Sequence, residues 1–383
     1  MADQYVTREI VRPEGFLSRL FSSIIGVFFG FLLIIGAVVL LYWNDGRYDI
    51  SNLARTAIPA NAAQSNPTLE GKLVSLSGTL VTKDTVGDGL YLKPGNYLAV
   101  HRVVEMYAWN EHSETHSTKN GDGSETKTTT YTYEKDWDES PTSTADFKQP
   151  NGHSQPTMAV KGGDFRVRTA AIGAYSLDLT NLSVPGQAPL NLTAENTNLS
   201  SGATLADGQT VYVGQGNSGA PQLGDLRIRY EVVPSGATVT AFGAARGTTL
   251  ARYVDGAGHA LFGVYAGSAD DAVRDMHGSY VTTTWIFRIV GFVVMWLGMH
   301  LLFGPILTLF GVIPIFGDVA GVLVWLVTFV AALTLTLITI IVSLILHSII
   351  ALALVVLLVV GVIAYRRHLS LNGIARFRPG RAI

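Results

Sequence analysis

Long uncharged apolar runs and one extended polar stretch set the pattern of this chain. Residues 21–43 contain no charged side chain, and the run ends on Tyr42 and Trp43. At about 1.5 Å per residue, such a helix covers the ~30 Å of hydrocarbon in a bilayer. An aromatic pair is favoured at the level of the lipid headgroups. The pattern therefore predicts a transmembrane helix at residues 21–43.

Two further runs lie near the C-terminus. We expect a second helix at 285–304, with Arg288 near its start extending outward to water and Pro305 closing it. The run 319–365 would form a helix of roughly 70 Å, more than twice the membrane thickness. We therefore expect it to fold back at His347, giving helices at 319–346 and 348–365. The apolar linker 305–318 lies in the membrane interface or forms a buried turn.

Arginines predict the orientation. Arg8, Arg12 and Arg19 precede the first run, and the C-terminal tail contains Arg366, Arg367, Arg376, Arg378 and Arg381. Four spans put both tails on one side, and the positive-inside rule makes that side cytoplasmic. Residues 1–20 and 366–383 are thus predicted to be cytoplasmic tails, and residues 44–284 to be periplasmic or luminal.

The polar stretch alternates with a period of two in several places. Leu226, Ile228, Tyr230 and Val232 fall on one face of a predicted strand. Segments 74–80, 98–110, 130–137 and 238–244 also resemble strands, and residues 111–127 are predicted to be the mobile tip of a long hairpin. A short helix is expected near 268–277, with two aspartates in its first turn. The stretch is predicted to be a mostly β (α+β) domain, possibly with two lobes divided near 150–160.

Composition supports this division of the chain into apolar terminal regions and a solvated central region. Charged residues make up 15% of the chain, against about 25% in soluble proteins. Residues 44–280 contain 18 of the 27 Lys and Arg and 25 of the 29 Asp and Glu, so the middle is mildly acidic. Nucleic-acid binding would need a basic patch and is not expected. The absence of cysteine excludes thiol catalysis and disulfides.

We find no pattern typical of a catalytic or cofactor site. His101, His112, His116 and His153 fall in the predicted hairpin region and are expected to be solvated rather than to bind a metal. Few ionisable residues fall in the apolar runs, where they would mark a transport path. Hydroxyl side chains of the third run could line a pore, although such groups more often bond within the helix; they are Thr334, Thr336, Thr339 and Ser343.

Several short motifs occur in a familiar order. They are residues 15–20 (GFLSRL), 44–47 (NDGR), 70–74 (EGKLV), 102–109 (RVVEMYAW), 131–133 (YTY) with Trp137, and 224–227 (GDLR). Together, and in their places relative to the apolar runs, they resemble the transmembrane protein 43 (LUMA) family over nearly the whole chain. The stretch 170–220 departs most from the family. The resemblance implies a four-span protein with a large luminal or periplasmic insert and no enzymatic activity, and we expect a prokaryotic member.

From this resemblance we expect a non-enzymatic membrane scaffold without cofactor or metal, with the lipid bilayer and other membrane proteins as partners and possible homo-oligomers. The alternative is a channel or lipid-handling protein. The expected location is a bacterial inner membrane, or the endoplasmic reticulum and inner nuclear membrane of a eukaryote. Aromatic strand residues usually pack in a core, but they also give a candidate partner surface, formed by Glu105, Tyr107, Trp109, Tyr131, Tyr133 and Trp137.

Overall fold

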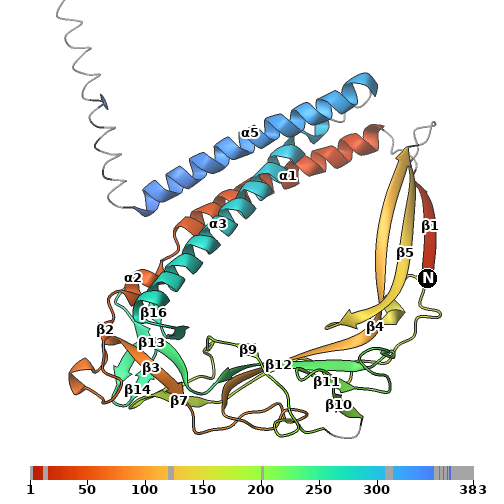
Figure 1. Cartoon of the computed structure of the whole chain (residues 1–383). Coiled ribbons are helices and arrows are strands. Elements are labelled where there is room, and N and C mark those ends of the chain that lie inside the picture. Colours follow the sequence, from red (N-terminus) through yellow and green to blue (C-terminus); the bar gives the residue numbers. More distant parts are fainter. Residues whose placement is uncertain are drawn as a thin grey trace, which may run out of the picture. The chain divides into compact units, whose positions relative to one another are not determined.

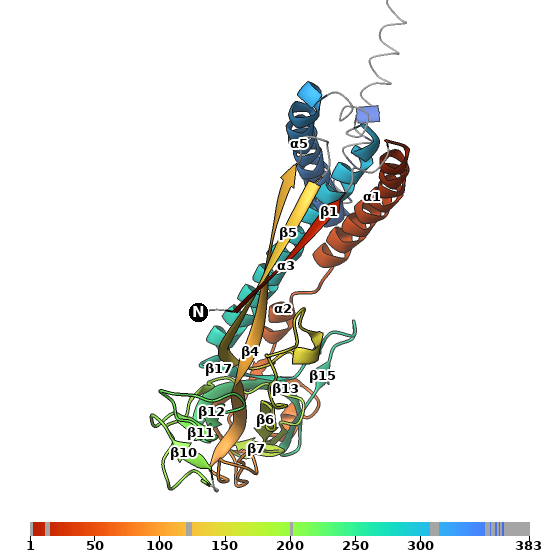
Figure 2. The same ribbon diagram turned by 90° about the vertical axis from the view of Figure 1, so that its right-hand side faces the viewer.

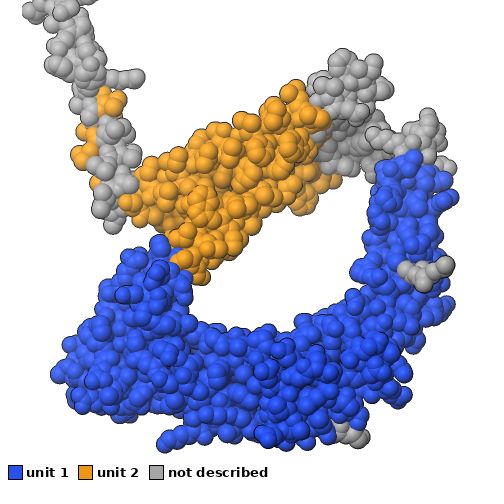
Figure 3. Space-filling view, in the orientation of Figure 1, with its two compact units in different colours: residues 1–13, 49–277 blue, residues 14–48, 278–383 orange. Residues whose placement is uncertain are grey.

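The structure, a computed structural model, describes residues 3–11, 16–119, 125–199, 202–306 and 314–348, and the isolated positions 353, 357, 360, 362 and 363. The chain forms two compact units, which Figure 3 shows in different colours. The first unit comprises Met1–Pro13 and Asp49–His277, and the second comprises Glu14–Tyr48 and Gly278–Ile383. Each unit is described by itself below.

The first unit is built on two sheets (Figure 1). The larger has the order β1-β5-β4-β12-β11-β10, with β6 paired to β4 and β9 paired to β12. Its strands are β1 (Asp3–Val11), β4 (Tyr97–Lys119), β5 (Glu125–Asp138), β6 (Gly163–Arg166), β9 (Ala188–Pro189), β10 (Ala203–Leu205), β11 (Thr210–Val213) and β12 (Leu226–Pro234).

The second sheet has the order β17-β13-β14-β8-β7-β3-β2, and an added pairing of β13 with β3 closes the path on itself. Its strands are β2 (Ile58–Pro59), β3 (Leu73–Val81), β7 (Thr169–Ile172), β8 (Tyr175–Asp178), β13 (Ala237–Arg246), β14 (Thr249–Ala251) and β17 (Gly263–Ala266). A separate ribbon joins β15 (Tyr253–Val254) and β16 (Ala260–Leu261). Both sheets take strands from before and after residues 150–160, so the unit is not divided at one point there.

The predicted alternation in β12 is confirmed. Leu226, Ile228, Tyr230 and Val232 are all buried, and they belong to one hydrophobic cluster with the inward residues of β4. The second sheet has its own cluster, which includes Leu76, Leu80 and Ile172. Period-two patterning thus identified the strands because one face of each is buried against a core.

The hairpin of β4 and β5 differs from the prediction. Residues 111–127 were expected to be a mobile loop, but β4 continues to Lys119 and β5 starts at Glu125, with pairs such as Glu111–Tyr133 and Lys119–Glu125. The tip itself, residues 120–124, is outside the described residues. Both faces of this outer part are polar, so it lies in water. Polarity alone predicted a loop, because no hydrophobic face marks a strand that is solvated on both sides.

The N-terminal segment also differs from its predicted role as a separate tail. Asp3–Val11 forms β1, which runs antiparallel to β5 from Asp3–Tyr133 to Val11–Glu125, and Figures 1 and 2 both show β1 beside β5. The charge of Arg8 suggested a solvated cytoplasmic tail. Arg8 is exposed within β1, so its charge is compatible with backbone pairing to β5, whose unpaired edge is a ready template for another strand.

Among the described residues, three helices are long and apolar enough to cross a membrane. They are α1 (Phe16–Asp45), α3 (Ala269–Leu302) and α5 (Pro314–His347); the shorter helical segments are α2 (Ile50–Ala54), η1 (Pro67–Leu69) and η2 (Thr144–Asp146). Three apolar helices and a mostly β domain are thus confirmed. α5 starts within the predicted linker and ends at His347, where the sequence predicted a break. The predicted fourth helix, 348–365, lies almost entirely outside the described residues.

α3 begins well before its apolar part. Ser268 caps it: the Asp271 amide donates to the Ser268 hydroxyl, and the Asp271 carboxylate accepts from the Ser268 amide and hydroxyl. Ala272 and Met276 then pack with Leu53 and Phe242 in the first unit. The short helix expected near 268–277 is therefore the first part of α3, because no helix breaker follows it.

In the second unit, α1 and α3 approach each other through glycines. A Cβ at Gly30 would lie 2.7 Å from the backbone oxygen of Gly298, and a Cβ at Gly298 would lie 2.8 Å from that of Gly30. Small residues allow such close packing of helices within a membrane. Ala37, Leu41, Met295 and Ala332 form the buried cluster among α1, α3 and α5.

Candidate functional site: a polar cluster at the helix ends

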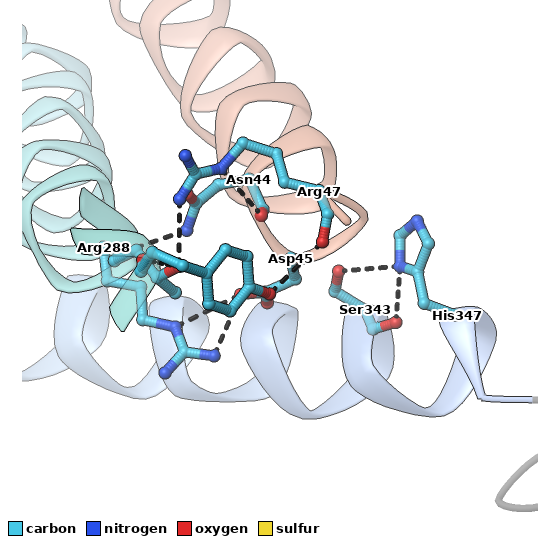
Figure 4. Close-up of polar contacts among 8 residues, drawn as sticks. Asn44, Asp45, Arg47, Arg288, Ser343 and His347 are labelled. Atoms are coloured by element: carbon cyan, nitrogen blue, oxygen red, sulfur yellow. Dashed lines mark hydrogen bonds and ion pairs between the residues drawn. The ribbon is translucent and has the colours of Figure 1, made fainter. Parts of the chain in front are cut away.

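Three segments of the second unit bring polar side chains together (Figure 4). They are residues 44–47 at the end of α1, residues 280–288 of α3, and the last turn of α5. The apolar run of α1 stops at Asn44 and Asp45, and its polar end meets the position where α3 becomes apolar. We call this group the helix-end cluster; it consists of Asn44, Asp45, Arg47, Tyr280, Thr284, Arg288, Ser343 and His347.

An ion pair occupies the centre of the helix-end cluster. Arg288 donates to Asp45 Oδ1 from Nη2 at 2.9 Å and from Nε at 3.2 Å. The Asp45 side chain has no exposed surface, and that of Arg288 is 18% exposed. Arg288 was expected to extend outward to water. It binds Asp45 instead, because a nearly buried guanidinium needs a counter-charge.

Hydrogen bonds tie the loop after α1 to α3. The Asn44 side-chain amide donates to the Thr284 carbonyl at 3.1 Å, and Arg47 Nη2 donates to the Thr284 hydroxyl at 2.9 Å. The Tyr280 hydroxyl donates to the Arg47 carbonyl at 3.2 Å. Two buried acceptors, Asn44 Oδ1 and Asp45 Oδ2, have no hydrogen-bond partner among the described residues.

His347 brings the end of α5 to the helix-end cluster. Its Nδ1 lies 2.9 Å from the Ser343 carbonyl, to which it donates, and its ring lies 4.4 Å from that of Tyr42. A Cβ at Gly46 would lie 2.4 Å from His347 Nε2, so only glycine fits there without movement of the imidazole. The helix-end cluster therefore fixes the ends of α1 and α5 and the middle of α3 against one another.

Several hydroxyls of α5 bond within the helix, whereas the Thr336 hydroxyl has no partner among the described residues and the Thr328 hydroxyl accepts from Trp296 of α3. Thr334 donates to the Val330 carbonyl at 2.9 Å, and Thr339 donates to the Leu335 carbonyl at 2.8 Å. Thr336 and Ser343 are buried. These contacts match the usual behaviour of hydroxyls in apolar helices, and they do not assemble a polar pathway within the described residues.

The six residues of the candidate partner surface lie on one face of the β4–β5 hairpin. Glu105 binds Arg227 and Arg229, and the Arg227 hydrogen bond holds the pKa of Glu105 below its usual range. Trp137 contacts Tyr107 at 5.4 Å between ring centroids and lies under the Arg227 guanidinium at 4.6 Å. Glu105, Tyr107 and Trp137 are therefore engaged in contacts within the domain.

The other end of the same face packs around His153. Its imidazole stacks on Tyr133 at 4.0 Å and meets the edge of Trp109 at 4.8 Å. Burial and the hydrogen bond to Glu111 raise the pKa of Tyr133 to about 12. Tyr131 contacts Tyr5 of β1. The other three histidines considered in the sequence, His101, His112 and His116, each lie beside a single carboxylate. The described residues contain no group of three metal ligands.

The sequence analysis missed the strongest polar clusters. In the first unit, Asp88 binds Arg102 and Tyr230, and Asp225 binds Tyr212. In the second, the Asp45–Arg288 pair joins residues far apart in the chain. One signal was available for the latter pair: an acid directly after one apolar run and an arginine near the start of the next are placed to meet if the two helices are antiparallel neighbours.

Comparisons with known proteins find one family. The profile described as transmembrane protein 43 matches residues 106–349. The chain is 27% identical to rat transmembrane protein 43 over 352 residues, 85% of each chain, and 26% identical to the human protein over 362 residues, 88% of each. A Drosophila melanogaster homologue is 25% identical over 71% of this chain and 74% of its own. No solved structure matches.

Proposed function

The chain belongs to the transmembrane protein 43 family, and from this premise we propose that it is a non-enzymatic scaffold that organises membrane protein complexes. The observation that carries the proposal is the helix-end cluster. Its side chains bind one another or nearby backbone rather than lining a cleft: Arg288 binds Asp45, Arg47 binds the Thr284 hydroxyl, and His347 binds the Ser343 carbonyl. Such a cluster supports a fixed helix assembly rather than acid–base chemistry.

The apolar helices also present large surfaces to their surroundings. Phe28 and Phe31 of α1, Ile289 and Leu297 of α3, and Leu337 and Ile341 of α5 are all exposed. In an integral membrane protein these surfaces meet lipid tails or the helices of other proteins. The bilayer and other membrane proteins, including further copies of this chain, are therefore the partners that we propose.

Purification tests the scaffold proposal. We expect the full chain, extracted from its native membrane into nanodiscs, to appear as a homo-oligomer or with stable membrane protein partners, as measured by mass photometry and mass spectrometry. Gly30→Ala should weaken these assemblies because the added Cβ meets the Gly298 oxygen. Gly36→Ala is the matched control, since its Cβ would meet nothing within 4 Å. A wild-type chain that is strictly monomeric and without partners would refute the proposal.

We further propose that the body of the β-rich domain is extracytoplasmic, and that a fourth span at 348–365 returns the basic tail to the cytoplasm. Single cysteines test this, because the chain has none of its own. Ser65→Cys in an exposed loop of the domain should react with an impermeant maleimide in intact cells, and Ser370→Cys should react only after permeabilisation. The reverse pattern, or labelling of both from one side, would overturn the orientation.

The pairing of β1 with β5 adds a second comparison. Gln4→Cys and Ser117→Cys should label alike, because both positions are exposed on the same three-stranded ribbon. If both variants are labelled in intact cells, as Ser65→Cys is expected to be, the two ends of α1 lie on the same side of the membrane. If both require permeabilisation, the outer part of the hairpin reaches the cytoplasmic face. Opposite labelling of the two would show that β1 is not paired with β5 in the cell.

A further inference from the structure

The larger sheet of the first unit contains a break beside β4. On the side away from β12, β4 pairs with β6 through Ala99–Arg166 to Arg102–Gly163, and with β5 only from Met106–Asp138 onward. The intervening residues Val103, Val104 and Glu105 have no neighbouring strand on that side in the described part of the chain. Residues 139–162 leave the sheet at this point and return as β6. The break is therefore three residues long and lies in line with β5 and β6.

The backbone of Val104 points into this break. On β4, the Tyr107 amide donates to the Asp225 carbonyl and the Tyr107 carbonyl accepts from the Gly224 amide, so Tyr107 directs its backbone groups toward β12. On the opposite side, the Leu98 carbonyl accepts from the Val167 amide. The direction of the backbone N–H and C=O groups alternates along a strand, so the even-numbered residues of β4 direct these groups toward β5 and β6. Val104 thus directs its N–H and C=O to the side where no strand lies.

Neither end of the break supplies these groups with a partner. Lys161 would be the next residue opposite Val104 in the β6 register, but its carbonyl accepts from Arg102 Nε and Nη2 at 3.1 and 2.8 Å. On the β5 side, the Ser140 amide donates to the Asp138 carboxylate. Val104 is 2% exposed, and its amide and carbonyl form no backbone hydrogen bond to a described residue outside the strands.

A cavity of about 690 Å³ opens over the break. That volume lies within the roughly 300–1,000 Å³ range of ligand sites. Its floor is residues 101–104 and Met106, and its walls come from residues 139–144 and residues 155–164. Hydroxyl groups dominate the walls, from Ser140, Thr142, Ser143, Thr144 and Thr157. Charged side chains of both signs also line it, among them Glu139, Asp164 and Lys161.

We propose that this break binds an extended segment of a partner protein, which lies antiparallel to β4, pairs with the backbone of Val104 and completes the sheet between β5 and β6. Strand addition uses the main-chain groups that are unpaired here, and the hydroxyl walls suit neutral polar side chains. A segment of about three to five residues fills the length at roughly 3.3 Å per residue. A proline at the pairing position is excluded because it has no N–H. The inference names one partner class for the proposed scaffold and rests on that function.

A peptide library tests this site on the full chain in nanodiscs. We expect a phage-displayed random heptapeptide library to yield peptides that bind the wild type and not empty nanodiscs. Ser140→Trp fills the cavity from one wall and Thr157→Trp from the other; each should weaken binding of the synthesised peptides at least tenfold. Ser65→Trp, in an exposed loop away from the cavity, is the matched control and should bind as the wild type does. N-methylation of one central peptide residue should also reduce affinity at least tenfold.

Three results would overturn the inference: no enriched peptide, peptides that bind both tryptophan variants as tightly as the wild type, or peptides whose binding is unaffected by N-methylation at every position. Thermal unfolding of both variants shows whether they remain folded, and two variants from opposite walls guard against the loss of one. The outcomes are separable from those of the scaffold test. A stable oligomer that binds no peptide would support the scaffold proposal and refute this site. A monomer without partners that binds peptides would refute the scaffold proposal and support this site.

Discussion

Each unit of the molecule buries an aspartate against an arginine, but the two pairs are completed differently. In the β-rich unit, Asp88 Oδ1 accepts from the amides of residues 90, 91 and 92 at 2.8–2.9 Å, and Oδ2 accepts from Tyr230 and Arg102. In the helical unit, Asp45 Oδ1 accepts twice from Arg288, and Oδ2 accepts from no described residue. Both carboxylates have no exposed surface.

This difference separates two roles for a buried ion pair. A carboxylate has about four lone-pair sites, and Asp88 uses both oxygens to fix a loop, a neighbouring strand and an arginine. Asp88 therefore acts as a structural clasp, by which we mean a carboxylate that holds the loop, the strand and the arginine together. Substitution of Asp88 or of one of its side-chain donors removes at least one hydrogen bond. Asp45 uses one oxygen, so half of its hydrogen-bonding capacity does not contribute to the fold. The number of donors, rather than burial, distinguishes the two.

The largest expected effect is that of Asp88→Asn. The amide NH₂ would face donors that now bond a carboxylate oxygen, and Arg102 would lose its counter-charge, so we expect a loss of about 3 kcal/mol or more. Hydrogen exchange of peptides from β4 and β12, in the full chain in nanodiscs, measures it. Asp84→Asn, at an exposed position nearby, is the control. A loss below about 1 kcal/mol would show that Asp88 is no clasp.

Acid should selectively weaken the β-rich unit. Burial alone would raise the pKa of Asp88 and of Asp225, but hydrogen bonds from Tyr230 and Arg102 to the former, and from Tyr212 and backbone amides to the latter, hold both pKa values below the usual range. Their contribution is therefore complete above the unfolded pKa of about 4 and is lost as the pH falls below it. Thermal unfolding between pH 7 and pH 3 measures this. Asp88→Asn should make the unfolding temperature less dependent on pH. An unchanged pH dependence in this variant would contradict the role given to Asp88.

Much of the fold follows from the sequence because its elements bury one face. The apolar helices and β12 are examples, since hydropathy and period-two alternation record burial directly. β1 and the outer hairpin were missed because neither buries a continuous apolar face, and their strand pairing uses backbone groups that leave no trace in side-chain patterns. The helix-end cluster was missed for another reason: Arg288 looks like a solvated charge until Asp45 is placed beside it.

Tyr230→Phe removes a single donor from the clasp. The Tyr230 side chain is 1% exposed, and its hydroxyl donates to Asp88 Oδ2 at 2.5 Å, so we expect a loss of about 2 kcal/mol, typical of a hydrogen bond to a charged group. Tyr280→Phe is the counterpart in the helical unit, where the hydroxyl donates to the Arg47 carbonyl. That change should cost below about 1 kcal/mol. Equal losses in chemical denaturation would remove the distinction between the two sites.

A smaller effect is expected for Asp45→Asn than for Asp88→Asn. Its carbonyl oxygen can keep both Arg288 bonds, and its NH₂ takes the place of an oxygen that bonds no described residue, so we expect a loss of at most about 1.5 kcal/mol. The same substitution at Asp88 provides the reference. Hydrogen exchange of α3 peptides measures it, and a loss as large as that at Asp88 would show that the Asp45 charge, and not its bonds, stabilises the helix ends.

The pairing of β1 with β5 also has a consequence in time. β1 is synthesised before β3 and β4, and its partner residues, from Glu125 onward, emerge only after those strands. At about 5–20 residues per second, β1 therefore waits on the order of ten seconds without a partner. Contacts of such large sequence separation form late, because the chain between them must first be ordered. β1 thus joins the sheet well after its own synthesis, and once β5 has emerged other extended chains compete with β1 for the edge of β5.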